Sequence, residues 1–128
     1  MKIVEIHVFQ HDLPVQDPPY RMALQDVWHL DTTIVMLVCD DGTVAFGETC
    51  PLGSTYQPQH ALGARAALVE LAPCLLGLDP TQIGRVNAAM DAHLMGHLYA
   101  KAAVDVACWD ATGKALGMRV CDLLGGAV

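Results

Sequence analysis

Basic residues are scarce in this sequence. Its 128 residues include 7 Lys and Arg against 14 Asp and Glu, which gives a formal net charge of -7. The cations are scattered and form no run. Binding to the phosphates of nucleic acid needs a basic face, and attraction to an anionic membrane needs a basic cluster. Neither partner is therefore expected, and the acidity favours solubility and, more weakly, a cationic partner.

Aromatic residues and long apolar runs are also rare. Phe, Trp and Tyr make up 5% of the chain, whereas hydrophobic residues make up 53%. Such a composition predicts one domain with a core of aliphatic side chains and alanine. No apolar run approaches the roughly 20 residues of a membrane-spanning helix.

Cysteine is present without a metal-binding or disulfide pattern. The five cysteines are spread along the chain, with no C-x-x-C and no zinc-ribbon spacing. The first residues do not resemble a secretion signal, so we expect reduced thiols in the cytoplasm, packed as small apolar side chains. Cys50 lies in a loop and could be considered as a nucleophile, but no basic residue is adjacent to it in sequence. An unreactive thiol is the preferred interpretation.

The chain begins with a predicted strand and a long loop. Lys2–Gln10 alternates between apolar and polar residues and is expected to end by Pro14. The side chains expected to face the core are Val4, Ile6 and Val8. Residues 15–29 predict a loop that closes into an edge strand between about Arg21 and Leu30.

A predicted hairpin completes the sheet. Thr32–Cys39 is apolar on both faces, which is typical of a central strand. Asp40-Asp41-Gly42 predicts a tight turn because Asp-Gly readily adopts positive φ, and Val44–Glu48 returns beside the central strand. Together the three strands form a predicted antiparallel meander.

The remainder of the chain predicts helices. The first covers Gln59–Leu71 and is expected to end at Pro73 and Gly77. Its expected core positions are Leu62, Ala66 and either Val69 or Leu68.

Two more helices follow. Asp79-Pro80 marks the expected start of the second, whose apolar stripe is Ile83, Val86, Met90 and Leu94. The third runs from about Leu98 to Leu116 and stops at Gly117. Its small, close-packing face is Ala103, Ala107 and Ala111. Strands followed by helices predict an α+β domain with the helices on one face of the sheet.

No catalytic set and no metal site is predicted in this chain. His93 and His97 are four residues apart, but Gly96 lies between them and a third ligand is missing. Two Lys–Asp spacings are interpreted as ordinary ion pairs on a solvated helix face. These pairs are Lys101 with Asp105 and Asp110 with Lys114.

The loop Thr49–Gln57 is the best candidate for a binding element, because a rigid scaffold would hold both of its ends. Glu48, at its start, is open to two interpretations: a general base, or an anchor that accepts backbone amides. Three of the seven aromatic residues lie in this loop and in the loop after the first strand. They are Tyr20, Trp28 and Tyr56. Their rings could contact a cation or pack between loops or domains, and the two interpretations are equally supported.

Four segments identify a family resemblance. They are Met1–Ile6, Gly47–Gly53, Tyr99–Asp110 and Leu123–Gly126. In this order they resemble the N-terminal domain of the enolase superfamily, in its mandelate racemase/muconate lactonizing branch, over essentially the whole chain. Within that branch, Gly47–Tyr56 and Gly96–Lys101 look most like the proline-betaine and hydroxyproline-betaine epimerases and the cis-3-hydroxyproline dehydratases.

The resemblance implies a division of labour between two domains. In this family the N-terminal domain caps a C-terminal (β/α)-barrel, which binds Mg²⁺ and removes the proton α to a carboxylate. The cap supplies two loops that exclude water and shape specificity, here about Val15–Trp28 and Thr49–Gln57. Tyr56 is then the best candidate to contact the cation of an N-methylated proline, with Trp28 and Tyr20 as weaker candidates.

The barrel is absent from this sequence, so its catalytic lysines and metal-binding acids cannot be assigned. Residues from about 118 to 128 would begin the link to it. We expect the chain to be inactive alone, and its parent to be a homo-oligomeric racemase, epimerase or dehydratase with a small amino-acid-derived substrate. The alternative is a free-standing, non-enzymatic binding or dimerisation module. Apolar surface near the C-terminal end predicts self-association of the chain.

Overall fold

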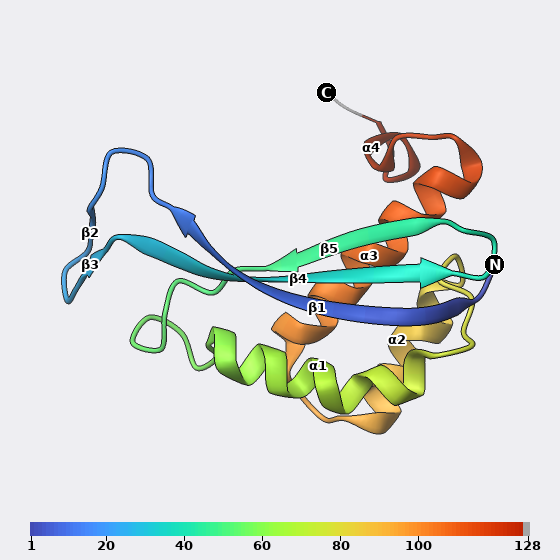
Figure 1. Ribbon diagram of the computed structural model, residues 1–128, viewed down its shortest axis with the longest axis horizontal. Coiled ribbons are helices and arrows are strands. Elements are labelled where there is room, and N and C mark those ends of the chain that lie inside the picture. Colours follow the sequence, from blue (N-terminus) through green and yellow to red (C-terminus); the bar gives the residue numbers. More distant parts are fainter. Residues whose placement is uncertain (127–128) are drawn as a thin grey trace.

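The computed structural model describes residues 1–126 and shows an α+β domain in which a sheet precedes a group of helices (Figure 1). The elements are β1 (Ile3–Pro14), β2 (Tyr20–Arg21), β3 (Asp26–Val27), β4 (His29–Cys39), β5 (Val44–Thr49), α1 (Ala61–Leu75), α2 (Ile83–His93), α3 (Leu98–Leu116) and α4 (Val120–Leu123). The predicted fold class is confirmed. The link predicted for residues 118–128 includes α4, and its last two residues lie outside the described part. None of the described helices is long and apolar enough to cross a membrane.

The main sheet is the predicted antiparallel meander. Its strand order is β1-β4-β5, which makes β4 the central strand. The turn between β4 and β5 has Gly42 at a φ of 84°, and the Gly42 amide donates to the carbonyl of Cys39 at 3.0 Å. Glycine adopts this left-handed conformation at little cost, so the Asp-Gly signal correctly located the turn.

The start of β1 differs from the predicted alternation. Val4 was expected in the core, but it is about half exposed, and Ile3 is buried instead. The pairing of β1 with β4 shifts between Ile3 and Glu5. This irregularity changes the alternation of side chains, so that Ile3 joins the same core as Ile6 and Val8.

A two-stranded arm extends from the main sheet. β1 pairs with β4 as far as Pro14 opposite His29, whereas β5 pairs with β4 only between Val38 and Thr33. At the end of the arm, β2 and β3 form a small separate sheet, seen at the left of Figure 1. The edge strand predicted from Arg21 to Leu30 is therefore wrong, because those residues contribute to two short strands and to the start of β4.

The helices cover one face of the sheet, and α3 lies closest to it. Ala103, Ala107 and Ala111 are fully buried, as predicted. Opposite them is Gly47 of β5, where an added Cβ would lie 1.9 Å from the carbonyl oxygen of Ala103. The small face of α3 thus lets the helix backbone approach the strand backbone directly. The boundaries of α3 and its stop at Gly117, which has a φ of 63°, also agree with the prediction.

The orientation of α1 was predicted incorrectly. Leu62, Ala66 and either Val69 or Leu68 were expected in the core. Leu62, Ala66 and Val69 are exposed, and only Leu68 is buried. The buried side chains of α1 are Ala61, Ala64, Ala67, Leu68, Leu71 and Leu75. Both faces of this helix are apolar, so periodicity alone could not choose between them. Pro73 also lies inside the helix, which continues to Leu75.

The predicted stripe of α2 is confirmed, but its start is not. Val86 and Met90 are buried, and Ile83 and Leu94 pack against the core. The helix begins at Ile83, and the Asp79 carboxylate instead accepts hydrogen bonds from the amide and the hydroxyl of Thr81. Asp79 therefore stabilises a turn that precedes the helix.

Candidate binding cleft between the arm and the following loop

The tip of the arm and the loop after β5 enclose an open cleft of about 380 Å³. Residues 20–25 line it from the arm, and Thr55 and Tyr56 line it from the loop. The Thr55 hydroxyl donates to Gln25 Oε1 at 2.9 Å, which joins the two walls. Within the arm tip, the amide of Met22 donates to the carbonyl of Gln25 at 2.9 Å. The volume lies in the range of small-molecule sites.

Tyr20 and Tyr56, two of the three aromatic residues singled out from the sequence, meet in this cleft. Both remain about half exposed, so their ring faces are accessible. Trp28 is also exposed but is not among the residues that line the cleft. The structure thus brings the two tyrosines together, and their role in binding remains a prediction.

Arg21 is a lining residue that the sequence reasoning missed. Arg21 is the only Lys or Arg between Lys2 and Arg65. A single basic residue in a loop otherwise free of positive charge could have marked it as a candidate binding residue. Its guanidinium provides a positive charge and planar donors that suit a carboxylate. The cleft therefore combines aromatic faces, which attract cations, with a cation that attracts anions.

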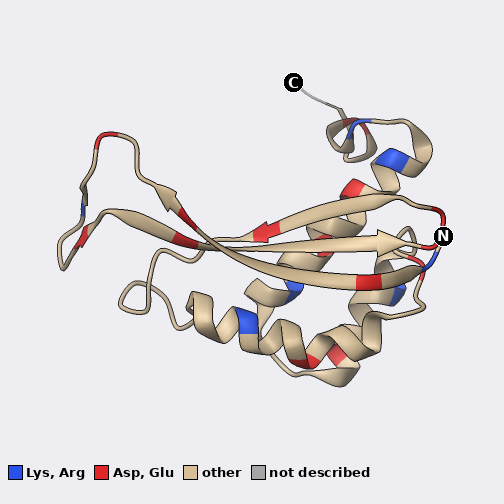
Figure 2. Ribbon diagram, viewed as in Figure 1, with Lys and Arg blue, Asp and Glu red and all other residues tan. Residues whose placement is uncertain are grey.

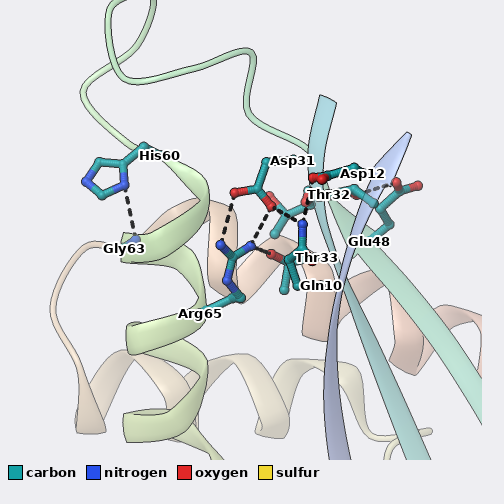
Figure 3. Close-up of polar contacts among 10 residues, drawn as sticks. Gln10, Asp12, Asp31, Thr32, Thr33, Glu48, His60, Gly63 and Arg65 are labelled. Carbon is teal, nitrogen blue, oxygen red and sulfur yellow. Dashed lines mark hydrogen bonds and ion pairs between the residues drawn. The ribbon is translucent and has the colours of Figure 1, made fainter. Parts of the chain in front are cut away.

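A polar network holds the arm against α1 (Figure 3). Arg65 of α1 donates to both carboxylate oxygens of Asp31 on β4, at 2.8 and 3.0 Å, and also to the Thr33 hydroxyl at 3.1 Å. Gln10 of β1 donates to Asp31 at 3.2 Å. The hydrogen bonds from Arg65 lower the pKa of Asp31, although partial burial opposes them. This network fixes both strands of the arm at the point where they leave the main sheet.

Among the described residues, Glu48 accepts a hydrogen bond from a side-chain hydroxyl and not from a backbone amide, whereas its interpretation as a general base stays a prediction. The hydroxyl of Thr32 donates to Glu48 Oε1 at 2.5 Å and also lies 3.3 Å from the carbonyl of Thr49. Glu48 thus ties β5 to β4 through a side-chain hydroxyl, and no backbone amide donates to it among the described hydrogen bonds. Burial raises the pKa of the nearby Cys50 thiol, which supports the unreactive interpretation.

Within the described part of the chain, His93 and His97 do not belong to a cluster of three or more potential metal ligands. His93 ends α2, while His97 precedes α3 in a left-handed conformation, with a φ of 51°. Within residues 1–126, no group of three or more His, Cys, Asp or Glu side chains could hold a metal ion. Basic residues are also dispersed over separate elements of the described chain (Figure 2).

The ion pairs expected on a solvated face of α3 were half correct. Lys114 and Asp110 form the predicted pair at 2.6 Å, and Asp110 also accepts from the Phe46 amide at 2.8 Å. Lys101, in contrast, is 6% exposed and pairs with Asp91 of α2 at 2.7 Å. Lys101 pairs with α2 instead of Asp105 because it lies beside that helix. Residue spacing within α3 cannot predict a partner on a neighbouring helix.

Comparison with known proteins identifies the family. The sequence profile of the mandelate racemase/muconate lactonizing enzyme N-terminal domain matches residues 3–125. The chain is 51% identical over 128 residues to a cis-3-hydroxy-L-proline dehydratase of Roseibium aggregatum, covering 99% of this chain and 35% of that protein. It is 32% identical to muconate cycloisomerase 1 of Pseudomonas putida, covering 94% of this chain and 33% of that protein.

Solved structures agree in fold. The structure superimposes with a TM-score of 0.95 on a mandelate racemase/muconate lactonizing enzyme structure from Roseovarius nubinhibens ISM complexed with magnesium. The two are 44% identical, and the match covers all of this chain and 35% of the other. The chain thus spans about a third of the length of its relatives. It belongs to the mandelate racemase/muconate lactonizing enzyme family of the enolase superfamily, as an N-terminal domain.

Proposed function

We propose that this chain is the capping and specificity domain of a Mg²⁺-dependent enzyme that abstracts the proton α to the carboxylate of a proline-derived substrate. The observation that carries the proposal is the cleft in which the arm tip meets the following loop. The higher identity to a cis-3-hydroxy-L-proline dehydratase than to a muconate cycloisomerase supports a proline-derived substrate.

The chemistry of the cleft supports an amino-acid substrate. A proline or its betaine carries a positive nitrogen and a negative carboxylate. The rings of Tyr20 and Tyr56 would attract the nitrogen, and Arg21 would draw the anionic group toward the cleft. When this wall closes on substrate, it excludes water from the reacting centre.

The described residues offer no cluster of ligands for the magnesium of the proposed reaction. A relative of the chain from Roseovarius nubinhibens was solved with magnesium, but the described residues contain no group of three acidic or histidine ligands. We therefore propose that a C-terminal barrel holds the metal and the acid/base residues. The isolated chain should have no racemase, epimerase or dehydratase activity.

The first test is the coding DNA beyond codon 128. A continued reading frame with Lys-x-Lys, spaced acidic metal ligands and a later lysine would support the capping role. A stop codon there would support the alternative, a free-standing non-enzymatic module. In that case saturable binding of a proline betaine by the chain alone would be expected, whereas the capping role predicts no detectable binding.

The second test uses the full-length protein with Mg²⁺. Exchange of the α-proton into deuterated water, or loss of water, is measured with cis-3-hydroxy-L-proline and with proline betaines. Tyr56→Leu should raise KM for the active substrate about tenfold, the effect of losing one cation–aromatic contact. Phe46→Leu, an exposed aromatic residue of the main sheet, is the control and should leave KM unchanged. Equal effects of the two variants would contradict a role for Tyr56 in the cleft.

A further inference from the structure

Tyr56, the aromatic residue that the loop after β5 contributes to the cleft, lies between two residues that are both held from elsewhere in the chain. On one side of it, the hydroxyl of Thr55 donates to Gln25 Oε1 of the arm at 2.9 Å. On the other side, Gln57 Oε1 accepts a hydrogen bond from the hydroxyl of Tyr99 on α3. The positions immediately before and after Tyr56 are thus each tied to a distant segment.

The backbone around Tyr56 forms a turn whose shape is set locally. The Tyr56 amide donates to the Gly53 carbonyl at 3.2 Å. Gly53 has a φ of 125°, and a Cβ there would lie 3.3 Å from Gln25 Nε2, so a glycine suits both the turn and the approach of the arm. In Figure 1 this loop, in green, lies between the arm and the helices. The local hydrogen bond shapes the turn, whereas the bonds to Gln25 and Tyr99 fix its place relative to the arm and α3.

Tyr99 is joined to the end of this loop by its backbone as well as by its side chain. Its amide donates to Gln59 Oε1 at 3.3 Å. Tyr99 lies in the first turn of α3, where amides lack partners within the helix, and the side chain of the preceding His97 makes no capping hydrogen bond. Gln59 supplies that cap instead. A single residue of α3 therefore holds two positions of the segment that follows Tyr56.

The helix that carries Tyr99 is a rigid support. Ala100, Ala103 and Val104, which follow Tyr99 in α3, are all buried, and the helix packs directly on the backbone of β5 at Gly47. Tyr99 itself lines a small cavity of about 130 Å³ together with residues 58–60, and it is not among the residues that line the cleft. A change of its hydroxyl should therefore reach the cleft through the loop.

We propose that Tyr99 is a positioning residue for Tyr56, and that its hydrogen bond to Gln57 keeps the Tyr56 ring at the wall of the cleft. This role rests on the proposed function, because it assumes that the cleft binds the substrate. Tyr99 does not touch the substrate; it holds Gln57, and Tyr56 makes the contact. A loop released from Tyr99 spends less time in the conformation that binds, and the apparent affinity falls with the fraction of time that is lost.

Steady-state kinetics of the full-length enzyme with Mg²⁺ tests this role. Tyr99→Phe removes one hydroxyl and keeps the ring. It should raise KM for the active proline-derived substrate about fivefold, the effect of losing one hydrogen bond, with little change in kcat. Thr112→Val is the matched control, because it also removes a hydroxyl of α3, one that donates to the Cys108 carbonyl at 2.8 Å. It lies roughly 20 Å along the helix from Tyr99 and should leave KM unchanged.

A double-mutant cycle separates positioning from a general loss of structure. If Tyr99 acts through Tyr56, adding Tyr99→Phe to Tyr56→Leu should change KM by less than about twofold. A merely structural role of Tyr99 would add its full effect in either background. Additive effects of the two substitutions on KM would therefore overturn the proposal, even if Tyr99→Phe alone raised KM.

Proteolysis of the 128-residue chain tests the loop without any enzymatic activity. Chymotrypsin cleaves after Tyr56, which is 60% exposed, and mass spectrometry locates the cut. Tyr99→Phe should speed this cleavage about fivefold, because the loop opens more often. Cleavage after Trp109, within α3, reports loss of the whole fold and should keep its wild-type rate. Thr112→Val should change neither rate.

The two experiments fail in different ways. Wild-type cleavage after Tyr56 in Tyr99→Phe would show that Tyr99 does not hold the loop, and the proposal would be wrong whatever the kinetics. Faster cleavage with an unchanged KM would show that the loop is held but that its position does not affect binding, which also overturns the proposal. A full-length protein that acts on no proline-derived substrate would refute the proposed function, and the cleavage rates would still decide whether Tyr99 positions Tyr56.

Discussion

Gly47→Ala should be one of the most damaging single-methyl changes in this domain. An ideal Cβ at this position would lie 1.9 Å from the Ala103 carbonyl oxygen, 2.7 Å from the Ala107 amide nitrogen and 3.0 Å from the Ala103 carbonyl carbon. The shortest of these contacts is more than 1 Å inside the 3.0 Å limit that real Cβ atoms respect. All three atoms belong to the backbone of α3, so no side chain can rotate out of the way.

The added methyl group must therefore separate α3 from β5. That movement opens the core around Val104 and Cys108, which are fully buried on α3. Overpacking of a core costs typically 1–3 kcal/mol. Because the clash here is with backbone, we expect a loss near the upper limit, about 3 kcal/mol of the free energy of unfolding. For a domain of this size that corresponds to a fall in Tm of roughly 10 °C.

Urea denaturation followed by circular dichroism measures this loss. The matched control is Gly84→Ala, at an exposed position of α2 where an added Cβ meets nothing within 4 Å. There the substitution should be neutral or stabilising by up to about 1 kcal/mol. The packing argument is refuted if Gly47→Ala unfolds within about 0.5 kcal/mol of wild type with an unchanged dependence on urea.

Three further outcomes follow from the polar groups and thiols. The pKa of Asp31 lies below its ordinary value of 3.8 because Arg65 stabilises the carboxylate. The ion pair therefore contributes to stability above pH 3.8, and this contribution is lost as the pH falls through the lowered pKa of Asp31. Asp31→Asn should therefore flatten the acid part of the stability curve, measured as urea midpoints between pH 2 and 6, and an unchanged curve would count against the ion pair. Iodoacetamide at pH 8 should label the exposed Cys121 but not Cys108, whose pKa burial raises to about 12, and mass spectrometry of the folded chain detects either result. Asp91→Asn should destabilise the domain by about 1–2 kcal/mol, more than Lys101→Met, because it leaves the buried ammonium without its partner; the reverse order in urea denaturation would disprove this account.

Local signals in the sequence predicted the parts of the fold that depend on near neighbours. The left-handed glycine after Asp40-Asp41 and the stop at Gly117 follow from the conformational freedom of glycine. The alanine face of α3 follows from spacing alone. Residue type and spacing also predict the order of strands and helices. The ordered motifs identify the family, and neither inference needs coordinates.

Only the tertiary structure decided which surfaces are buried and which distant residues meet. Both faces of α1 are apolar, so the choice of its core side depended on the sheet and helices that it packs against. Lys101 pairs with a residue of another helix, and Tyr20 and Tyr56 line one cleft because the arm tip lies beside the loop after β5. The sequence by itself thus determined local conformation and family membership, because these depend on residue type and spacing. The cleft and the choice of the buried side of α1 depend on contacts between segments far apart in the chain, which spacing along one helix or strand does not encode.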